Sequence, residues 1–370
     1  MILLNDLNRQ YLRQKKEIDI TIKNTIKNSD FINGKNVNKF AKNFSKKLGM
    51  KYCITVGNGT DALMIAIKSL KLKKDDEVIT TCNGWISTAE AIIANNCKPV
   101  FVDQDETFTM NVKDLIKKIT KKTKLILPVH LYGNPSDMKK IKKICKIKKI
   151  FLIEDCAQAH FAKIGKKNVG TFGDISTFSF FPGKPMGCFG DGGAICTNSR
   201  EKFIFMKSYA NHGGMAKHQH NVYGINSRLD NLQAGILNIK LKKISNWNNK
   251  RIKIAKIYNK ELSKVLNVKL PFVKKKFKSV YNNYVIRVPS KYRLNLINYL
   301  IKNNIQTNVH YPKPISDLKI YKKFIPNKIK FNFTDKYKNE ILSIPMHPFL
   351  KLSEIKKICG LINKFLKNKI

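Results

Sequence analysis

Residues 170–197 read GTFGDISTFSFFPGKPMGCFGDGGAICT, and this stretch decides the fold. Two runs of β-branched and aromatic residues, ISTFSFF (175–181) and GAICT (193–197), are typical of buried strands. The segment between them is too short for the crossover helix that joins two parallel strands. We therefore predict that one of these strands is antiparallel to its neighbours. The turn between them contains Lys184, held between two prolines and a glycine.

Five similar runs precede this stretch, at spacings of roughly 22 to 27 residues: KYCITV (51–56), DEVITTC (76–82), KPVFVD (98–103), TKLILPVH (123–130) and IFLIEDC (150–156). Several of the intervening segments have helical spacing, such as Ala62, Ile65 and Ala66. Alternation of strand and helix predicts an α/β domain with a mostly parallel sheet covered on both faces.

The pattern changes after SRLDNLQAGIL (227–237), where a long helix is predicted. A smaller α+β unit follows, with a strand in YNNYVIRV (281–288), a helix in RLNLINYLIKNN (293–304) and a last helix after MHPFLKLSEI (346–355). We place the boundary inside the long helix. The prediction is a large domain over residues 1–240 and a small C-terminal domain over 241–370.

The charge balance invites a nucleic-acid or membrane interpretation, because 71 Lys and Arg against 25 Asp and Glu give a net charge of +46. Most of this excess is lysine scattered without an Arg-rich block, which favours solvated helix faces over a nucleic-acid partner. No apolar stretch approaches the ~18 residues of a membrane span. The eight cysteines form no CxxC pair and indicate reduced core residues in a cytoplasmic protein.

A metal site is not predicted. His212, His218 and His220 cluster in the sequence but have no cysteine or carboxylate at ligand spacing.

Ligands of open α/β sheets bind at the carboxyl ends of the strands, so the residues just after each strand are the candidates. Gly57-Asn58-Gly59-Thr60 opens a helix after the first strand, which suits a phosphate, although it equally suits an ordinary turn and helix cap. GNGTDA lacks the third glycine of a dinucleotide fingerprint, and GKP lacks the Ser or Thr of a P-loop. Asp155 ends another strand, and Lys184 follows a third. A lysine in a desolvated site can form a Schiff base.

A Schiff-base lysine, an acid for a pyridinium nitrogen and a phosphate-binding helix start are what pyridoxal 5′-phosphate requires of a protein. The chain resembles the DegT-type sugar aminotransferases, a branch of the fold-type-I pyridoxal-phosphate enzymes, nearly from end to end. The resemblance rests on ordered motifs: GNGTDAL (57–63), HLYGNPSDM (130–138), IEDCAQAH (153–160), the stretch 170–197, NHGG (211–214), GINSRLDNLQAGIL (224–237) and LSIPMHP (342–348).

The resemblance implies that Lys184 binds the cofactor covalently, that Asp155 pairs with its pyridinium nitrogen, and that Gln158 hydrogen-bonds its phenolic oxygen. It also implies that Trp85 stacks on the pyridine ring. The phosphate contacts that it implies come from Gly59, Thr60, Asp61 and Ser179. For Trp85 the alternative is a packing role on a helix.

The same resemblance implies that Asn226 reaches the phosphate in a neighbouring subunit, which makes the protein a homodimer with shared active sites. It implies that Arg228 holds the carboxylate of the amino donor; the alternative is a structural ion pair with Asp230. His160, His310 and Tyr311 are candidates for the sugar pocket, and core or supporting roles are equally open for each.

The implied reaction is a two-stage transamination from glutamate, released as 2-oxoglutarate, to a nucleotide-activated keto sugar, in surface-polysaccharide or amino-sugar biosynthesis. A ketone at C3 is favoured over one at C4. Two alternatives are a pyridoxal-phosphate sugar dehydratase, in which histidine replaces the lysine at position 184, and a regulatory DNA-binding protein.

Overall fold

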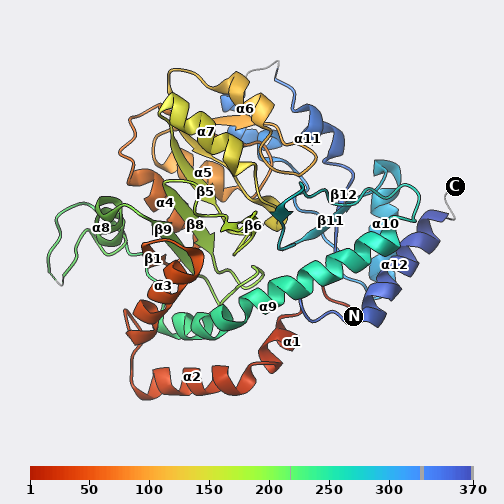
Figure 1. The fold of residues 1–370 in the computed structure, drawn as a ribbon, viewed down its shortest axis with the longest axis horizontal. Coiled ribbons are helices and arrows are strands. Elements are labelled where there is room, and N and C mark those ends of the chain that lie inside the picture. Colours follow the sequence, from red (N-terminus) through yellow and green to blue (C-terminus); the bar gives the residue numbers. More distant parts are fainter. Residues whose placement is uncertain (217, 326–328, 368–370) are drawn as a thin grey trace.

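The computed structural model describes residues 1–216, 218–325 and 329–367. Its largest sheet within these ranges has seven strands in the order β1-β9-β8-β5-β4-β2-β3 (Figure 1). The strands are β1 Tyr52–Val56, β2 Glu77–Thr81, β3 Lys98–Val102, β4 Thr123–Leu127, β5 Phe151–Asp155, β8 Ile175–Ser179 and β9 Gly193–Thr197. Strand β9 pairs antiparallel with both β1 and β8, whereas β8, β5, β4, β2 and β3 run parallel. The predicted α/β class and the single antiparallel strand are confirmed.

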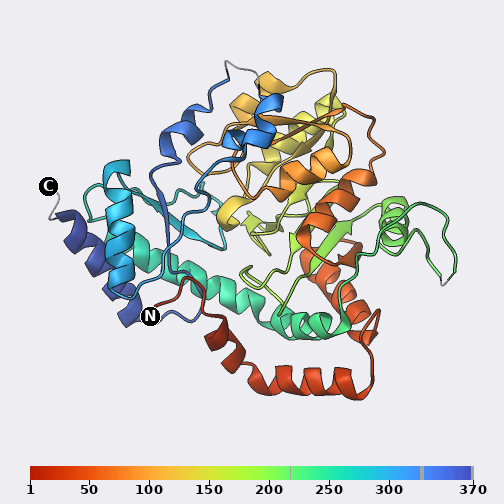
Figure 2. The same cartoon turned by 180° about the vertical axis from the view of Figure 1, so that it is seen from behind.

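Helices cover both faces of this sheet (Figures 1 and 2). One face packs on α3, α6, α7 and the first half of α9, and the other packs on α4, α5 and α8. Apolar residues at helical spacing create these contacts, as Phe40, Phe44 and Leu48 do on α3. The bounds are α1 Leu7–Leu12, α2 Lys15–Lys27, α3 Lys35–Leu48, α4 Gly59–Lys68, α5 Ser87–Ala94, α6 Val112–Lys118, α7 Met138–Lys148, α8 Arg200–Tyr209 and α9 Asn231–Leu262.

Helix α9 joins two hydrophobic cores. Leu237, Ile244 and Trp247 pack in the core of the large sheet, and the buried residues from Ile254 onward pack in a second core. The second core, which we call the C-terminal unit, contains β11 Tyr284–Arg287, β12 Ile341–Ile344, α10 Ser290–Lys302 and α12 Leu352–Lys367. The division of the chain at residue 240 stays a prediction.

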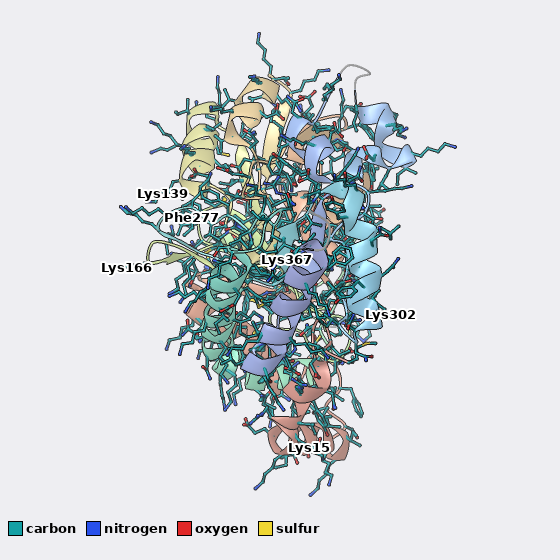
Figure 3. The ribbon with its side chains drawn as sticks, turned by 90° about the vertical axis from the view of Figure 1, so that its right-hand side faces the viewer. Lys15, Lys139, Lys166, Phe277, Lys302 and Lys367 are labelled. Atoms are coloured by element: carbon teal, nitrogen blue, oxygen red, sulfur yellow. The ribbon has the colours of Figure 1, made fainter. Side chains whose placement is uncertain are left out.

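Short elements complete the described chain: β6 Lys163–Ile164, β7 Lys167–Asn168, β10 Phe277–Lys278, α11 Asn332–Tyr337 and the 3-10 turns η1 Leu131–Gly133, η2 Ile315–Asp317 and η3 Lys319–Phe324. Among the described residues, no helix is long and apolar enough to cross a bilayer. The eight cysteines are free thiols. Lysine side chains such as Lys15, Lys139 and Lys302 project from many sides of the molecule (Figure 3).

Candidate active site

A cavity of about 850 Å³ lies at the carboxyl ends of β1, β5 and β8, and residues 308–312 of the C-terminal segment form part of its wall. This is the edge of the sheet that the sequence predicts for a ligand. Most of the predicted site residues line it: Gly59, Thr60, Asp61, Trp85, Asp155, Gln158, Ser179, Lys184, His310 and Tyr311. His160, Asn226 and Arg228 lie outside its lining.

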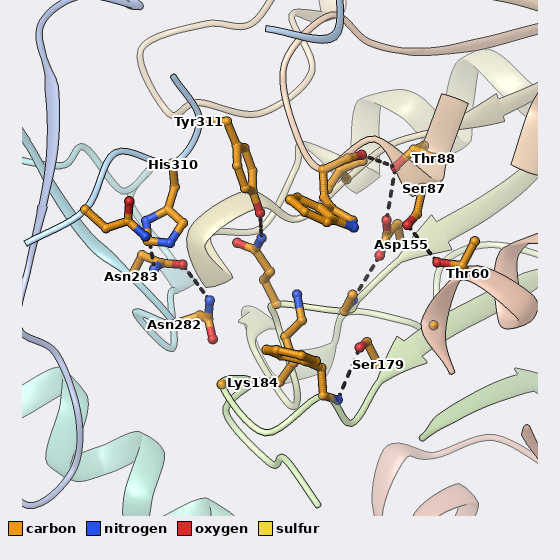
Figure 4. Close-up of a pocket in the computed structure, with 18 of the residues that line it drawn as sticks. Thr60, Ser87, Thr88, Asp155, Ser179, Lys184, Asn282, Asn283, His310 and Tyr311 are labelled. Carbon is orange, nitrogen blue, oxygen red and sulfur yellow. Dashed lines mark hydrogen bonds between the residues drawn. The ribbon is translucent and has the colours of Figure 1, made fainter. Parts of the chain in front are cut away.

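Asp155 is the last residue of β5, and its buried carboxylate points into the cavity (Figure 4). The carboxylate accepts hydrogen bonds from the backbone N–H of Ala157 at 3.0 Å and from the hydroxyl of Thr88 at 3.4 Å. Burial raises the pKa of Asp155, and the positive charge of Lys184 opposes this effect. A cationic group bound beside the carboxylate would therefore stabilise its charged form.

Lys184 follows β8 in a turn closed by a hydrogen bond from its own backbone N–H to Phe181 O at 2.9 Å. Its side chain also points into the cavity (Figure 4). Burial lowers the pKa of Lys184, and the carboxylate of Asp155 opposes this shift. The neutral amine is the nucleophilic form, so the cavity favours the state of Lys184 that attacks a carbonyl carbon.

The start of α4 forms a cradle for an anion. The Asn58 side chain caps the helix by accepting from Asp61 N at 2.8 Å, and Thr60 shares a 2.7 Å hydrogen bond with Ser87. Gly59 approaches Ser179 so closely that a Cβ on it would lie 2.7 Å from Ser179 Cβ. Only glycine fits here, which leaves helix N–H groups and hydroxyls facing the cavity.

Trp85, Gln158 and Tyr311 also line the cavity, and the Tyr311 ring points into it (Figure 4). Gln158 donates to the Tyr311 hydroxyl at 3.0 Å and accepts from Tyr132 N at 2.7 Å. The ring centroids of Trp85 and Tyr311 are 5.6 Å apart, and Trp85 is 57 % exposed. Trp85 precedes α5 and is not a core residue, so its flat face is available to a ligand.

Neutral polar groups that sequence reasoning missed also line the cavity, and Asn282 and Asn283 lie on the side away from Asp155 (Figure 4). These groups are Asn282, Asn283 and Asn308, beside the predicted His310. His310 Nδ1 lies 2.7 Å from the Ser343 hydroxyl and 3.3 Å from Asn283 Nδ2. Burial lowers the pKa of His310 to about 4, so the imidazole is neutral at pH 7.

Sequence reasoning also missed Leu4, Asn5 and Asp191 in the lining. Asp191 is the acidic residue of the glycine-rich run GCFGDGGAICT, and an acid in such a run could have marked it as a candidate site residue. Nothing in the composition singles out the asparagines.

His160 packs beneath the site and does not line it. The imidazole is 0 % exposed, and its ring lies 5.6 Å from both Phe178 and Phe180. Burial lowers the pKa of His160 to about 3. The exposed Asn226 pairs with Asn211 through a backbone bridge, and Arg228 is half-buried beside it.

One buried group of possible metal ligands occurs among the described residues: His130, Glu154 and Cys156, whose ligand atoms lie within 4.8 Å of one another. Hydrogen bonds within the protein account for the proximity of His130 and Glu154. The Glu154 carboxylate accepts from Gly170 N, Phe172 N and Gly173 N at 2.7–2.8 Å and lies 3.1 Å from His130 Nε2, while His130 Nδ1 accepts from Ser136 N. The cluster therefore ties the loop after β7 to β5.

An amine with a lowered pKa, a buried carboxylate and an anion cradle share one cavity, and they fit the three parts of pyridoxal 5′-phosphate. Lys184 would hold its aldehyde carbon, Asp155 its ring nitrogen, and the Gly59–Ser179 cradle its phosphate. The fold and the site thus define a pyridoxal-phosphate-dependent enzyme.

The chain belongs to the DegT/DnrJ/EryC1/StrS aminotransferase family, whose model matches residues 13–363. It is 37 % identical over 366 residues to the dTDP-3-amino-3,6-dideoxy-alpha-D-galactopyranose transaminase of Aneurinibacillus thermoaerophilus, covering 99 % of both chains. It is 36 % identical to the UDP-2-acetamido-2-deoxy-3-oxo-D-glucuronate aminotransferase of Pseudomonas aeruginosa, covering 97 % of this chain and 99 % of the relative. The crystal structure of S. venezuelae DesV in complex with a ketimine intermediate superposes with a TM-score of 0.95 at 30 % identity, covering 99 % and 98 % of the chains. The predicted family, fold, enzyme class and cofactor are confirmed.

Proposed function

We propose that this aminotransferase moves the amino group of glutamate to the ketone of a nucleotide-linked sugar, for surface-polysaccharide or amino-sugar biosynthesis. The observation that carries the proposal is the Lys184 amine opposite the Asp155 carboxylate, in a cavity of about 850 Å³ that has room for a sugar beside the cofactor. Relatives of nearly full length that act on nucleotide-linked sugars support the substrate class.

The residues divide the chemistry between them. The cofactor supplies an electron sink for the carbanion formed at the carbon that bears nitrogen. Asp155 would keep a proton on the ring nitrogen, because its buried carboxylate and a protonated nitrogen beside it would stabilise each other. Lys184, as a free amine, would accept the proton from the donor carbon as a general base. Trp85 would flank the ring, and Gln158 would face its phenolic oxygen.

The neutral polar groups that line the cavity suit sugar hydroxyls. Asn282, Asn283 and Asn308 offer amide donors and acceptors without a formal charge, and His310 stays neutral at pH 7. We favour a ketone at C3 over C4, in line with the two named transaminases above, which carry 3-amino and 3-oxo sugars in their names.

The function is tested with purified protein loaded with pyridoxal phosphate. Glutamate alone is expected to convert the cofactor to its amino form, which is followed by the loss of the yellow absorbance, because the first half-reaction requires no sugar. A panel of 3-keto and 4-keto nucleotide sugars with glutamate is then analysed by mass spectrometry for an amino-sugar product. Absence of spectral change with glutamate and every other amino acid would overturn the proposal.

We also propose a homodimer in which each subunit completes the other's site. Asn226 and Arg228 lie outside the lining of their own cavity, and Asn226 is exposed. Contact with a partner's cofactor phosphate by Asn226, and with the donor carboxylate by Arg228, gives both residues a ligand. The free cysteines support a reducing compartment such as the cytoplasm.

Subunit complementation tests the shared site. Asn226→Ala and Lys184→Ala variants are each expected to be impaired, with Lys184→Ala near zero. After equal mixing and reannealing, about half of the dimers are hybrids by random pairing. Each hybrid carries one intact composite site out of two, so up to roughly a quarter of wild-type activity returns. Activity no higher than the mean of the two parents would show that both residues serve one subunit's site.

The two alternatives are not favoured. Lys184 occupies the position where a sugar dehydratase would have histidine, and relatives named as transaminases match nearly the full length of the chain. A DNA-binding regulator requires no lysine and acid pair in a cavity.

A further inference from the structure

Residues 2–12, which include α1, form what we call the N-terminal strap. The strap lies against the C-terminal unit, where the N-terminus is seen beside α12 (Figures 1 and 2). The contacts that tie it there include Ile2 N to Asn304 O at 2.7 Å, Leu4 N to Gln306 Oε1 at 2.8 Å, Met346 N to Leu4 O at 3.0 Å, and Arg9 to the Glu354 carboxylate at 2.7 Å.

The same strap contacts the turn that carries Lys184. Asn5 Nδ2 donates to the carbonyl of Gly183 at 3.2 Å. On the other side of the turn, Lys240 Nζ of α9 donates to Gln10 Oε1 at 2.8 Å and to the carbonyl of Gly187 at 2.5 Å. The strap and Lys240 therefore hold the two ends of the segment 183–187.

Lys240 is an unusual residue for this role. Its side chain is 1 % exposed, and its ammonium lies 4.7 Å from the centroid of the Phe189 ring. No carboxylate pairs with it among the described residues. Burial lowers the pKa of Lys240 to about 8. A buried charge without a counter-ion costs free energy, and its neutral acceptors offset only part of that cost. An apolar residue would fill the space at lower cost.

The turn also has little freedom of its own. Gly187 packs so tightly that a Cβ would lie 2.3 Å from Pro182 O, and Cys188 N donates to Phe180 O at 2.7 Å. A shift of Gly187 therefore moves the whole turn, and the Lys184 side chain moves with it. Errors of about 1 Å at a reacting group can cost on the order of a hundredfold in rate.

We infer that Lys240 is a positioning residue of the transamination: by holding Gly187 and Gln10 together it sets the position of Lys184 and couples it to the strap and the C-terminal unit. This inference rests on the proposed function only for its kinetic part, because the hold on the turn exists without substrate.

The test compares Lys240→Met, which keeps the length and removes the donors, with Lys243→Met. Lys243 lies on the same helix and is exposed, and its ion pair within the described part of the chain is with Glu17 at 3.8 Å. We expect Lys240→Met to slow the glutamate half-reaction roughly tenfold or more while the KM for glutamate changes less than about twofold. Lys243→Met should match wild type in both.

Hydrogen exchange of cofactor-free protein gives the independent readout. The amides of residues 183–188 should exchange faster in Lys240→Met than in wild type, with the strands β5 and β8 unchanged. Gln10→Ala, which removes only the strap's acceptor, covers the case in which Lys240→Met does not fold. It should raise the same exchange and slow the half-reaction severalfold.

Wild-type exchange in the turn together with wild-type rates in these variants would overturn the inference. A lower melting temperature with an unchanged rate would also overturn it, because it marks a merely structural lysine. If wild-type protein fails to react with any amino donor, the proposed function fails, and the exchange data alone then decide whether Lys240 holds the turn.

Discussion

Lys184 and Asp155 perturb each other in opposite directions from the two sides of one cavity. Burial lowers the pKa of the amine and raises the pKa of the carboxyl group, and each is partly restored by the charge of the other. The charged carboxylate is therefore poorly stabilised alone, and a ligand with a cationic ring nitrogen would stabilise it while favouring the neutral amine of Lys184.

Asp155→Asn separates cofactor binding from catalysis. An amide can still pack against the ring but cannot keep its nitrogen protonated, so bound cofactor should remain while turnover falls by roughly 10²- to 10⁴-fold. Absorbance and mass spectrometry measure the bound cofactor, and the glutamate half-reaction measures the rate. A variant with wild-type turnover would remove Asp155 from this role.

The pH dependence of cofactor capture reports on Lys184. In cofactor-free protein the neutral amine captures pyridoxal phosphate, so the rate of capture should rise with pH to a plateau. The midpoint of this rise should lie below ~10.4, the pKa of a free lysine side chain. Asp155 raises the pKa of Lys184 by stabilising the ammonium. Asp155→Asn should therefore move the midpoint to lower pH. A midpoint that stays in place or rises would contradict the coupling of these two residues.

Site residues could be predicted where a strand leads directly to them. Asp155 and Lys184 follow apolar runs that mark strand ends, and the sheet's parallel order then brings them together. Asn282 and Asn308 line the cavity but come from the chain after α9, beyond the strands of the large sheet. No local pattern distinguishes them from the many surface asparagines. His160 follows the same strand as Asp155, yet its side chain turns into the core.

Among the elements, the strands of the large sheet follow the predicted runs closely, because buried parallel strands are nearly continuous in apolar residues. No element is predicted before residue 51, yet α2 and α3 pack against α9. Helix α2 is lysine-rich and has few apolar residues, so its stability comes from tertiary contacts more than from local pattern. Helix α3 has Phe40, Phe44 and Leu48 at helical spacing, which is a signal that could have predicted it. The two-residue strands β6, β7 and β10 are too short to leave a periodic signal.

Two glycine substitutions in helices separate an effect on helix stability from an effect on cofactor binding. Gly360 lies exposed in α12, and a methyl group added to its Cα would meet no atom within 4 Å, so Gly360→Ala should stabilise the fold by about 0.5–1 kcal/mol. Gly59→Ala brings a methyl group against Ser179 and should destabilise the start of α4 and weaken cofactor binding.

Thermal melts of both variants, with and without pyridoxal phosphate, check the comparison. Cofactor should stabilise Gly360→Ala as much as wild type, and Gly59→Ala much less. Equal stabilisation of both variants would show that the cradle at α4 does not bind the phosphate.

At the scale of the whole molecule, the net charge of +46 is unevenly distributed between the outer surface and the cavity. The described lining of the cavity contains Asp61, Asp155 and Asp191 but a single lysine, Lys184. The cavity itself therefore offers an anion little net attraction. Lysines such as Lys15, Lys139 and Lys302 project from the outer surface (Figure 3), and the excess of positive charge gives the molecule a long-range positive potential.

This distribution predicts that anionic ligands are captured by the field of the whole protein. Salt shortens the Debye length from about 30 Å at 0.01 M to about 10 Å at 0.1 M and so removes long-range attraction before it affects contacts inside the cavity. Capture of pyridoxal phosphate by cofactor-free protein should slow about tenfold between ~0.01 M and ~0.3 M salt. Pyridoxal has the same ring and aldehyde but no phosphate, so its slower capture should change less than about twofold. If both compounds showed the same salt dependence, the effect would lie in the Lys184 and Asp155 pair that both encounter, and the surface lysines would have no part in capture.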